Sequence, residues 1–330
     1  MKAYIEKLIA GQDLKDAEME QAFDRIMSGS AHDTQIGAFL VALRAKGETP
    51  SEIASAVRSM WDKAVKVNVN FDVVDTCGTG GDNAFTFNIS TATAFVLAGA
   101  GHKVAKHGNR SISSSSGSAD CLEALGVPID LGPEEAGEAL REKDFAFLFA
   151  PRYHPSMKFA MPARKQLGIK TIFNILGPLA NPAGASHQLI GVYAQGLIEP
   201  VIEVLSILGL KGAMVVYSGM DEVSISRPTA YARLYEGQIT TGVINPEAYG
   251  ITPVPVDELR VGTPSESARL IEAVFTGTLK GPCLDCIRIN AAAGFMAIGD
   301  AEDMQEGIEM ASMVIEKGKA LESLNRARDL

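Results

Sequence analysis

Apolar and polar residues follow a helical period over the first 66 positions. Apolar side chains recur at three- and four-residue spacings in three stretches, which are 17–27, 34–46 and 50–65. The last stretch follows Thr49, a favourable helix cap, and begins with a proline and an acidic first turn. Because no strand pattern interrupts this region, the sequence predicts a small N-terminal helical domain.

From Phe71 onward, short apolar runs alternate with helical stretches. Strands are predicted at 71–76, 103–106, 145–149, 188–193 and 213–217. Helices are predicted at 90–100, 117–125, 133–143, 155–167 and 301–317, and an edge hairpin around Gly237 is predicted within 232–243. This alternation is typical of an α/β fold with a largely parallel central sheet.

One segment, 174–182, breaks the alternation. It holds two prolines and a glycine, which favours an ordered loop or a crossing between domains. A chain of 330 residues also exceeds what one hydrophobic core usually organises. We therefore predict a helical domain over 1–70, with a contribution from about 155–185, and a larger α/β domain over 71–330.

Composition and charge restrict the classes of function. Apolar residues make up 46% of the chain and charged residues 21%, as in an ordinary globular protein. The formal charge of -10 argues against a nucleic-acid partner, because such a surface needs clustered Lys and Arg. No apolar run reaches about 18 residues, and the N-terminus lacks the apolar core of a signal peptide. We expect a cytoplasmic protein with no membrane partner.

The four cysteines are too sparse for a disulfide framework. Cys283 and Cys286 form a CxxC pair, but a zinc site would need two further nitrogen or sulfur ligands at suitable spacing. Neither a second CxxC nor a local histidine pair is present. We expect the pair to serve in packing, with weak redox chemistry as the alternative.

The densest chemical signal is a glycine-rich turn after a predicted strand, with the sequence DTCGTGGD at 75–82. The next helix begins with polar residues, NIST at 88–91. Glycines let backbone amides approach phosphate oxygens, and a helix N-terminus adds donors and a positive dipole. Asp82 would repel a phosphate unless it binds a cation or a sugar hydroxyl. The turn matches neither the P-loop nor the dinucleotide-binding pattern, and a tight turn without a ligand is the alternative.

A second polar cluster, KHGNRSISSSSGS at 106–118, lies between a predicted strand and a predicted helix. Ligands of open α/β sheets bind beyond the carboxyl ends of the strands, where both clusters are expected. Lys106 and Arg110 suit phosphate groups, and the serines offer donors to a polyphosphate. The alternative is a flexible serine loop, although such a loop would not need the KHGNR sequence.

Two adjacent carboxylates, Asp221 and Glu222, follow Gly219 after another predicted strand. In a loop both side chains can converge on a hard cation. Mg²⁺ prefers such oxygen ligands and usually keeps several waters beside substrate phosphates. A solvated acidic turn is the alternative.

Together these motifs resemble those of the anthranilate phosphoribosyltransferase family. The matching motifs are GTGGD at 78–82, TFNIST at 86–91, KHGNR at 106–110, SGSAD at 116–120 and DE at 221–222. The segment from His154 through Arg164 to Pro182 and the NAAA stretch at 290–293 are also similar. Two positions depart from the pattern, since Asn83 stands where many members have Gly and Ser115 where many have Lys.

The resemblance implies a nucleoside phosphorylase/phosphoribosyltransferase-like fold, an active site at the hinge between the domains and a homodimer formed through the helical domain. It implies transfer of the phosphoribosyl group of 5-phosphoribosyl 1-pyrophosphate to the amine of anthranilate in tryptophan biosynthesis, with Mg²⁺ as cofactor. A pyrimidine nucleoside phosphorylase-like enzyme is one rival, although such a chain would be longer and would lack KHGNR. A non-catalytic nucleic-acid-binding member is the other, and the net charge and the DE pair oppose it.

The resemblance also assigns site residues. Phosphoribosyl pyrophosphate would be held by Gly78, Gly81, Asp82, Thr86, Asn88, Ile89, Ser90, Thr91, Lys106, His107, Gly108, Asn109, Arg110, Ser111, Ile112, Ser113, Ser114 and Ser118. Anthranilate would be held by Gly78, Asn109 and Arg164, with His107, Tyr153 and Met157 nearby. Magnesium would be held by Ser90, Asp221 and Glu222. No covalent nucleophile is implied, and His107 is expected to shape the substrate site rather than to carry a proton.

Overall fold

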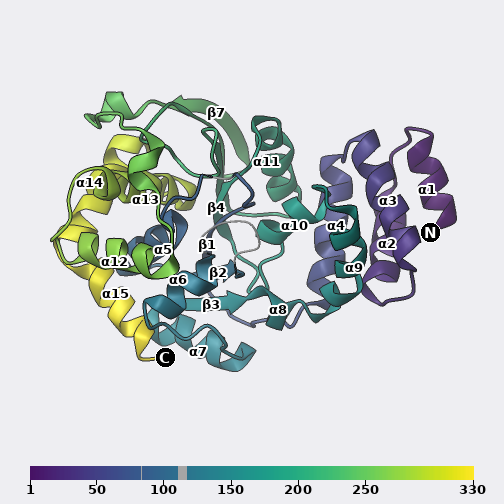
Figure 1. The fold of residues 1–330 in the computed structure, drawn as a ribbon, viewed down its shortest axis with the longest axis horizontal. Coiled ribbons are helices and arrows are strands. Elements are labelled where there is room, and N and C mark those ends of the chain that lie inside the picture. Colours follow the sequence, from purple (N-terminus) through teal and green to yellow (C-terminus); the bar gives the residue numbers. More distant parts are fainter. Residues whose placement is uncertain (83, 111–116) are drawn as a thin grey trace.

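Four N-terminal helices form one end of the molecule, on the right of Figure 1. The computed structural model describes residues 1–82, 84–110 and 117–330. The four helices are α1 (Lys2–Ile9), α2 (Asp16–Met27), α3 (Asp33–Lys46) and α4 (Pro50–Lys63). Helices α2 to α4 confirm the three predicted helices. They bury a shared core in which the rings of Phe23 and Phe39 meet edge to face, 6.3 Å apart.

A later part of the chain completes this helical core. It consists of α8 (Ala150–Tyr153), the 3₁₀ helix η1 (Pro155–Phe159), α9 (Met161–Leu167) and α10 (Phe173–Leu179). The ring of Phe173 lies 5.6 Å from that of Phe23, and α9 contacts α3. Ala160, Ile172 and Leu176 are buried in the same cluster. The helical end of the molecule is therefore built from two separate stretches of sequence.

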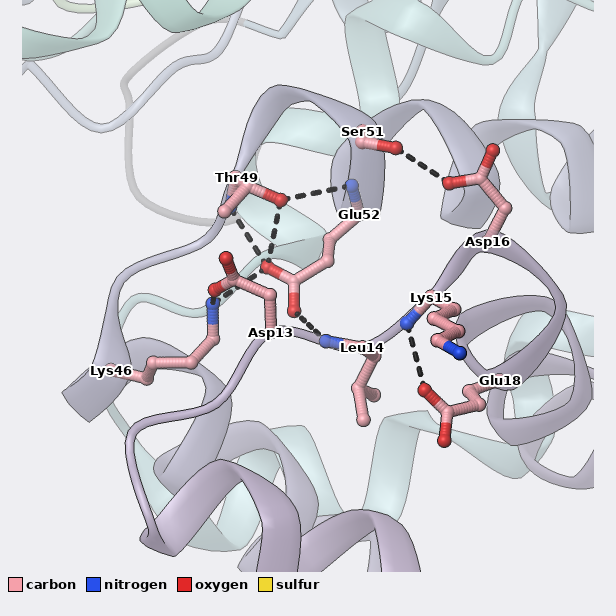
Figure 2. Close-up of polar contacts among 9 residues, drawn as sticks. All are labelled: Asp13, Leu14, Lys15, Asp16, Glu18, Lys46, Thr49, Ser51 and Glu52. Atoms are coloured by element: carbon pink, nitrogen blue, oxygen red, sulfur yellow. Dashed lines mark hydrogen bonds and ion pairs between the residues drawn. The ribbon is translucent and has the colours of Figure 1, made fainter.

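Glu52 is a buried carboxylate that joins three segments of the helical domain (Figure 2). Its Oε1 accepts a hydrogen bond from the amide of Leu14 at 2.9 Å, and its Oε2 accepts from Nζ of Lys46 at 2.8 Å. Oε2 also accepts from the amide of Thr49 at 2.9 Å, while the Thr49 hydroxyl accepts from the Glu52 amide at 3.2 Å. This capping box starts α4 where the sequence predicted it.

The rest of the chain builds a seven-stranded sheet with the order β3-β2-β1-β4-β5-β6-β7. The strands are β1 (Val74–Gly78), β2 (Val104–Gly108), β3 (Phe145–Phe149), β4 (His187–Gly191), β5 (Gly212–Tyr217), β6 (Thr229–Tyr235) and β7 (Gln238–Ile244). The first five pair in parallel, and β6 and β7 form the predicted antiparallel hairpin around Gly237. The predicted α/β fold with a largely parallel sheet is thus confirmed.

Helices cover both faces of the sheet (Figure 1). One hydrophobic cluster contains α5 (Ile89–Gly99), α6 (Ser118–Ala124), α12 (Pro264–Phe275), α13 (Pro282–Ile298), α14 (Met304–Glu316) and α15 (Lys319–Arg328). A second cluster runs from the other face through α11 (Ile198–Ile207) into the N-terminal helices. The two domains therefore share a continuous apolar core.

Shorter elements complete the architecture. Helix α7 (Pro133–Lys143) packs on β3, and the 3₁₀ helices η2 (Gln195–Leu197), η3 (Pro246–Tyr249) and η4 (Val256–Leu259) lie in connections. The CxxC cysteines are unbonded and buried on α13, in agreement with a packing role. In the part of the chain that the structure describes, no helix combines the length and apolar character needed to cross a membrane.

Two predicted segments differ from the structure. The single helix predicted over 155–167 is divided at Ala160 into η1 and α9, because Pro162 lacks the amide that would continue the preceding turn but is tolerated at a new helix start. The loop predicted over 174–182 is wrong in its first part, because α10 continues to Leu179. Pro178 lies in the last turn of α10, so its missing amide removes only one helical hydrogen bond.

Replacing Glu52 by alanine should lower the free energy of unfolding of the helical domain by about 3–5 kcal/mol, because Lys46 would lose a buried partner. Trp61, the single tryptophan, lies on α4 and reports on this domain by fluorescence during urea denaturation. Glu20→Ala is the control, since Glu20 on α2 has no hydrogen-bond or ion-pair partner among the described residues. Equal losses in the two variants would contradict the role of Glu52.

Candidate active site

Four strand ends lie side by side at one edge of the sheet. Strand β1 lies between β2 and β4, and β5 follows β4, all of them parallel. Their carboxyl ends therefore bring the glycine turn, the KHGNR segment and the loop of Asp221 and Glu222 to one place. Because β1 has β2 on one side and the much later β4 on the other, this edge is a topological switch point, where open α/β sheets bind ligands.

The glycine turn after β1 contacts the carboxylate loop after β5. The amide of Gly80 donates to Oδ2 of Asp221 at 2.8 Å, and the amide of Asp221 donates to Oδ2 of Asp82 at 3.3 Å. This contact requires glycine in both neighbouring strands. A Cβ on Gly78 would lie 2.1 Å from Oδ2 of Asp221, and a Cβ on Gly191 would lie 1.5 Å from the Asp221 carbonyl oxygen. The fold thus joins two motifs that the sequence separates.

Negative charge is crowded at this contact. Burial and the neighbouring Asp82 raise the pKa of Asp221 to about 7, and burial and Asp221 raise the pKa of Glu222 above its usual value. A divalent cation would relieve this repulsion. The described residues contain no preformed cluster of three or more His, Cys, Asp or Glu side chains suited to a metal. The two carboxylates therefore fit a cation that also takes oxygens from a hydroxyl, water and a substrate phosphate, as Mg²⁺ does.

Lys106 lies beneath the same site with its side chain buried. Its Nζ donates to Oγ of Ser90 at 3.1 Å and to the carbonyl of Thr76. The backbone of Ser90 in turn lies near Glu222 and favours the charged form of that carboxylate. Burial lowers the pKa of Lys106, and the nearby charge of Asp75 opposes that shift. The predicted magnesium residues Ser90, Asp221 and Glu222 are thus brought together above one buried cation.

A buried carboxylate, Asp75, ties the sheet to the chain that returns from the helical domain. Nδ2 of Asn181 donates to Oδ2 of Asp75 and to the carbonyl of Ala105, both at 2.8 Å. Oδ1 of Asp75 accepts from the amide of His107 at 3.2 Å. Burial raises the pKa of Asp75 to about 6, although Lys106 and these hydrogen bonds favour the charged form. The carboxylate therefore fixes β1, β2 and the returning chain together.

His107 is buried at the junction between the two domains and is neutral. Its Nδ1 lies 3.2 Å from the carbonyl oxygen of Gly177, which can only accept, so Nδ1 carries the proton. The ring of His154 lies 5.1 Å away. Burial and His154 lower the pKa of His107 to about 3. Nε2 of His107 is buried with no partner in the described residues. This nitrogen can therefore accept a hydrogen bond, while the proton on Nδ1 is already donated to Gly177.

Arg164 places a guanidinium on the helical side of this junction. It lies on α9, 5.0 Å from the centre of the Phe173 ring, and Nη1 contacts the sulfur of Met161 at 3.7 Å. No acidic side chain among the described residues pairs with Arg164, and burial lowers its pKa. The arginine is therefore able to receive an anion from elsewhere.

Two other residues assigned to anthranilate are part of the packing. Met157, in η1, packs against the helical core. The ring of Tyr153 is fully buried, and its hydroxyl donates to the carbonyl of Leu131 at 2.9 Å. Because that hydrogen bond directs the side chain of Tyr153 into the protein, the structure does not bring its polar group to the site.

The end of the KHGNR segment lies near α6. The carbonyl of Asn109 accepts from the hydroxyl of Ser118 at 3.3 Å. Arg110 pairs with Asp120 at 2.9 Å and with Glu123 at 2.5 Å, so its charge is neutralised by α6 rather than presented to a phosphate. The predicted residues Ser111, Ile112, Ser113 and Ser114, and the departures Asn83 and Ser115, lie outside the described residues.

The remaining predicted phosphate residues are divided between the site and the core. Gly81 has a left-handed φ of 76°. Asn88 caps α5 and accepts from the Thr91 hydroxyl at 2.5 Å, whereas Ile89 and Thr91 are buried, so their side chains serve packing. The backbone of Thr86 forms an isolated antiparallel β-bridge with that of Arg260. The two further residues are Gly108, which ends β2, and Ser118, which begins α6.

Four residues of this region were not predicted to act at the site. Asp75 and Asn181 lay within recognised segments, but no spacing pattern indicates that they meet across the fold. Lys170 is a single lysine in the loop between α9 and α10, and its Nζ donates to the carbonyl of Gly81 at 3.2 Å. His154 followed a predicted strand end and began a segment that resembles the family, and these two signals could have identified it.

Comparisons with known proteins agree with this architecture. The helical bundle domain of a glycosyl transferase family matches residues 2–64, and the a/b domain of that family matches residues 70–321. These matches define a two-domain glycosyl transferase. The anthranilate phosphoribosyltransferase of Persephonella marina is 48% identical over 333 residues, which cover 100% of this chain and 98% of the relative. The chain belongs to the anthranilate phosphoribosyltransferase family, as its motifs predicted.

Solved structures are similar over almost the whole chain. The anthranilate phosphoribosyltransferase of Thermus thermophilus has a TM-score of 0.93 and 38% identity, covering 99% of this chain and 98% of that one. The Saccharomyces cerevisiae enzyme in complex with PRPP and Mg has a TM-score of 0.91 and 28% identity, covering 99% and 96%. The yeast enzyme has also been solved with 4-fluoroanthranilate.

Asp75→Asn should remove a pH-dependent part of the stability. A carboxyl group whose pKa is raised on folding stabilises the protein at a pH below its unfolded pKa. That stabilisation is lost as the pH rises through the folded pKa. For Asp75 the pKa rises from 3.8 to about 6. The free energy of unfolding of the variant, relative to the wild type, should therefore rise by about 2 kcal/mol between about pH 4 and about pH 7. Urea denaturation across that range measures it.

The Asp329→Asn variant, which removes an exposed carboxyl group near the C-terminus, is the control. A difference for Asp75→Asn that stays constant over the same range would contradict a raised pKa at Asp75.

Proposed function

We propose that the chain transfers the phosphoribosyl group of 5-phosphoribosyl 1-pyrophosphate to the amine of anthranilate and releases pyrophosphate, a step of tryptophan biosynthesis. The observation that carries this proposal is the meeting of Gly80, Asp221 and Lys106 at one edge of the sheet, with Arg164 on the helical side. This arrangement suits a phosphorylated sugar on one side and a carboxylate-bearing aromatic amine on the other. The relatives named for this activity support it.

Phosphoribosyl pyrophosphate binds along the glycine turn and the beginning of α5. Backbone amides and the positive end of a helix favour phosphate oxygens. Lys106 adds a buried cation at the carbonyl of Thr76, in the strand that leads into the turn. Asp82 and Asn88 offer oxygen acceptors for sugar hydroxyls, which accounts for a carboxylate beside an anion site.

The residues present fit a magnesium ion, because two half-buried carboxylates with raised pKa values lie near the backbone of Ser90. Asp221 and Glu222 would hold it, with Ser90 beside them. When bound, Mg²⁺ supplies positive charge that stabilises the departing pyrophosphate. The magnesium complex of the yeast enzyme supports this assignment.

Anthranilate binds on the opposite side, with its carboxylate at Arg164 through charge-assisted hydrogen bonds. Asn109 and the neutral ring of His107 lie on the β2 side of the junction and orient the amine. Because the pKa of His107 is lowered to about 3, the ring shapes the site and does not act as a proton carrier near neutral pH.

In the reaction, the bond from C1 of the ribose to pyrophosphate breaks as the amine nitrogen bonds to C1, and the nitrogen then loses a proton. The chain forms no covalent intermediate. Its residues hold the two substrates in line and stabilise the charge that develops on the leaving group. These interactions are stronger in the transition state than in the ground state, which is the condition for catalysis.

The proposed assembly is a homodimer formed through the helical domain, in the cytoplasm and without a nucleic-acid partner. Exposed apolar side chains on this domain support the interface. They are Ile9 on α1, Val41 on α3, Phe159 in η1 and Met161 on α9.

Pyrophosphate release tests the proposed function. Release should require phosphoribosyl pyrophosphate, anthranilate and Mg²⁺ together, and phosphorolysis of a pyrimidine nucleoside should not occur. Release that is independent of anthranilate, or no release at all, would overturn the proposal.

Changing Asp221 and Glu222 together to alanine should lower kcat by about 100-fold or more, because the leaving group loses electrostatic stabilisation. The melting temperature should not fall greatly, since the two carboxylates repel each other in the folded protein. The control is the double change of Asp257 and Glu258 to alanine, an acidic pair in η4. Near-normal activity of the first variant throughout a magnesium titration would refute the assignment.

Arg164→Ala should raise the KM for anthranilate by roughly 10- to 150-fold, since hydrogen bonds to charged groups contribute about 1.5–3 kcal/mol. The KM for phosphoribosyl pyrophosphate should change little. Arg152→Ala, which removes an exposed guanidinium paired with Asp130 on the surface, is the matched control. An equal loss for both substrates would show that Arg164 does not bind the carboxylate.

A further inference from the structure

We infer that Lys170 is a positioning residue that ties the helical side of the junction to the glycine turn and thereby strengthens the binding of phosphoribosyl pyrophosphate. The inference rests on the proposed function and names a residue that acts on the same site through Gly81. Lys170 stands between α9 and α10, outside the glycine turn, the KHGNR segment and the carboxylate pair.

The ammonium group of Lys170 is held by two partners of the α/β domain. Nζ donates to the carbonyl oxygen of Gly81 at 3.2 Å. The same atom lies 3.5 Å from the centre of the Tyr193 ring, which follows β4. A cation over an aromatic face is attracted by the ring quadrupole. The two contacts fix the position of the charge, although the side chain comes from a loop.

The backbone of Lys170 is held from the other domain. Its carbonyl oxygen accepts a hydrogen bond from Nη1 of Arg44, on α3. One residue therefore bonds to the helical bundle through its main chain and to the glycine turn through its side chain. No other lysine or arginine of the described residues has both contacts.

The glycine turn needs an external tie of this kind. Gly80 and Gly81 both have left-handed backbones, with φ of 66° and 76°, and neither has a side chain that could pack and hold the turn. Glycine loses more conformational freedom on ordering than any other residue. By holding the Gly81 carbonyl, Lys170 reduces the freedom that the turn would otherwise lose on binding phosphate, and such preorganisation increases affinity.

The effect extends to the carboxylate loop. The Gly80 amide donates to Asp221, so a displaced turn would also displace a residue assigned to magnesium. In addition, Lys170 forms no ion pair with an acidic side chain of the described residues. Its positive charge beside Gly81 is therefore not neutralised by protein, and it favours the approach of a phosphorylated substrate.

Steady-state kinetics of Lys170→Ala, Lys170→Met and Lys170→Arg test the inference, with Lys165→Ala of α9 as the control. Lys165 is exposed and has no hydrogen-bond or ion-pair partner among the described residues. Alanine and methionine should each raise the KM for phosphoribosyl pyrophosphate by about 10-fold, and arginine should restore most of it. The KM for anthranilate should stay within about twofold, a split that a general loss of structure would not produce.

Calorimetric titration with phosphoribosyl pyrophosphate and MgCl₂ should show the same loss of affinity without the chemical step. Tyr193→Phe keeps the ring and should leave the affinity unchanged, whereas Tyr193→Leu removes the ring and should weaken binding several-fold. If Lys170→Ala does not fold, Lys170→Met, which keeps an apolar stem, decides the test.

Unchanged binding of phosphoribosyl pyrophosphate in the alanine and methionine variants would overturn the inference. An equal rise of both Michaelis constants, or a failure of arginine to restore binding, would also overturn it. A wild-type protein that releases no pyrophosphate would instead overturn the proposed function, so the two failures are distinguishable.

Discussion

The arrangement of the two domains depends on one buried contact, between the Asn181 amide and the Asp75 carboxylate. A buried carboxylate is unfavourable unless hydrogen bonds satisfy its oxygens, and Asn181 and the His107 amide do so here. The chain leaves the sheet after β3, builds helical core through α8, α9 and α10, and returns at Asn181. Because Asn181 also bonds Ala105 of β2, the place where the helical region meets the strand ends is fixed at this point.

Charge and space at those strand ends are coupled. Gly78 and Gly191 allow the carboxylate loop to lie against β1 and β4, and this close approach buries Asp221 next to Asp82 and raises its pKa. The resulting cluster of carboxylates would repel a pyrophosphate group that carries no bound cation. A cation bound there removes that repulsion, and by thermodynamic linkage the phosphorylated substrate strengthens the binding of the cation in return. The proposed site is therefore complementary to the cation and the phosphorylated substrate together rather than to either one alone.

Local patterns predicted the elements and the motifs well, and long-range contacts poorly. The spacing of apolar residues and the helix-capping residues indicated the N-terminal helices, the alternation of strands and helices indicated the parallel sheet, and the glycines indicated the turn after β1. These features depend on residues that are neighbours in the sequence. Helix α13 was missed because it is buried on nearly all sides and has no polar face to produce a period. The partners of Tyr153 and Lys170 could not be predicted either. Each partner lies on a separate element, and only the completed fold decides which carbonyl each side chain reaches.

One short segment serves both sides of the proposed reaction. Helix α9 carries Arg164, which faces no carboxylate of the described chain, and the loop that follows carries Lys170, which reaches the glycine turn. Arg44 holds this segment from α3, while Asn181 holds the chain beyond α10 on the sheet. A displacement of the segment would therefore move two groups together: the guanidinium proposed to bind the aromatic acid and the ammonium proposed to hold the glycine turn. Because rate depends steeply on the relative position of two reactants, fixing one segment at both ends controls their distance more effectively than holding each substrate separately.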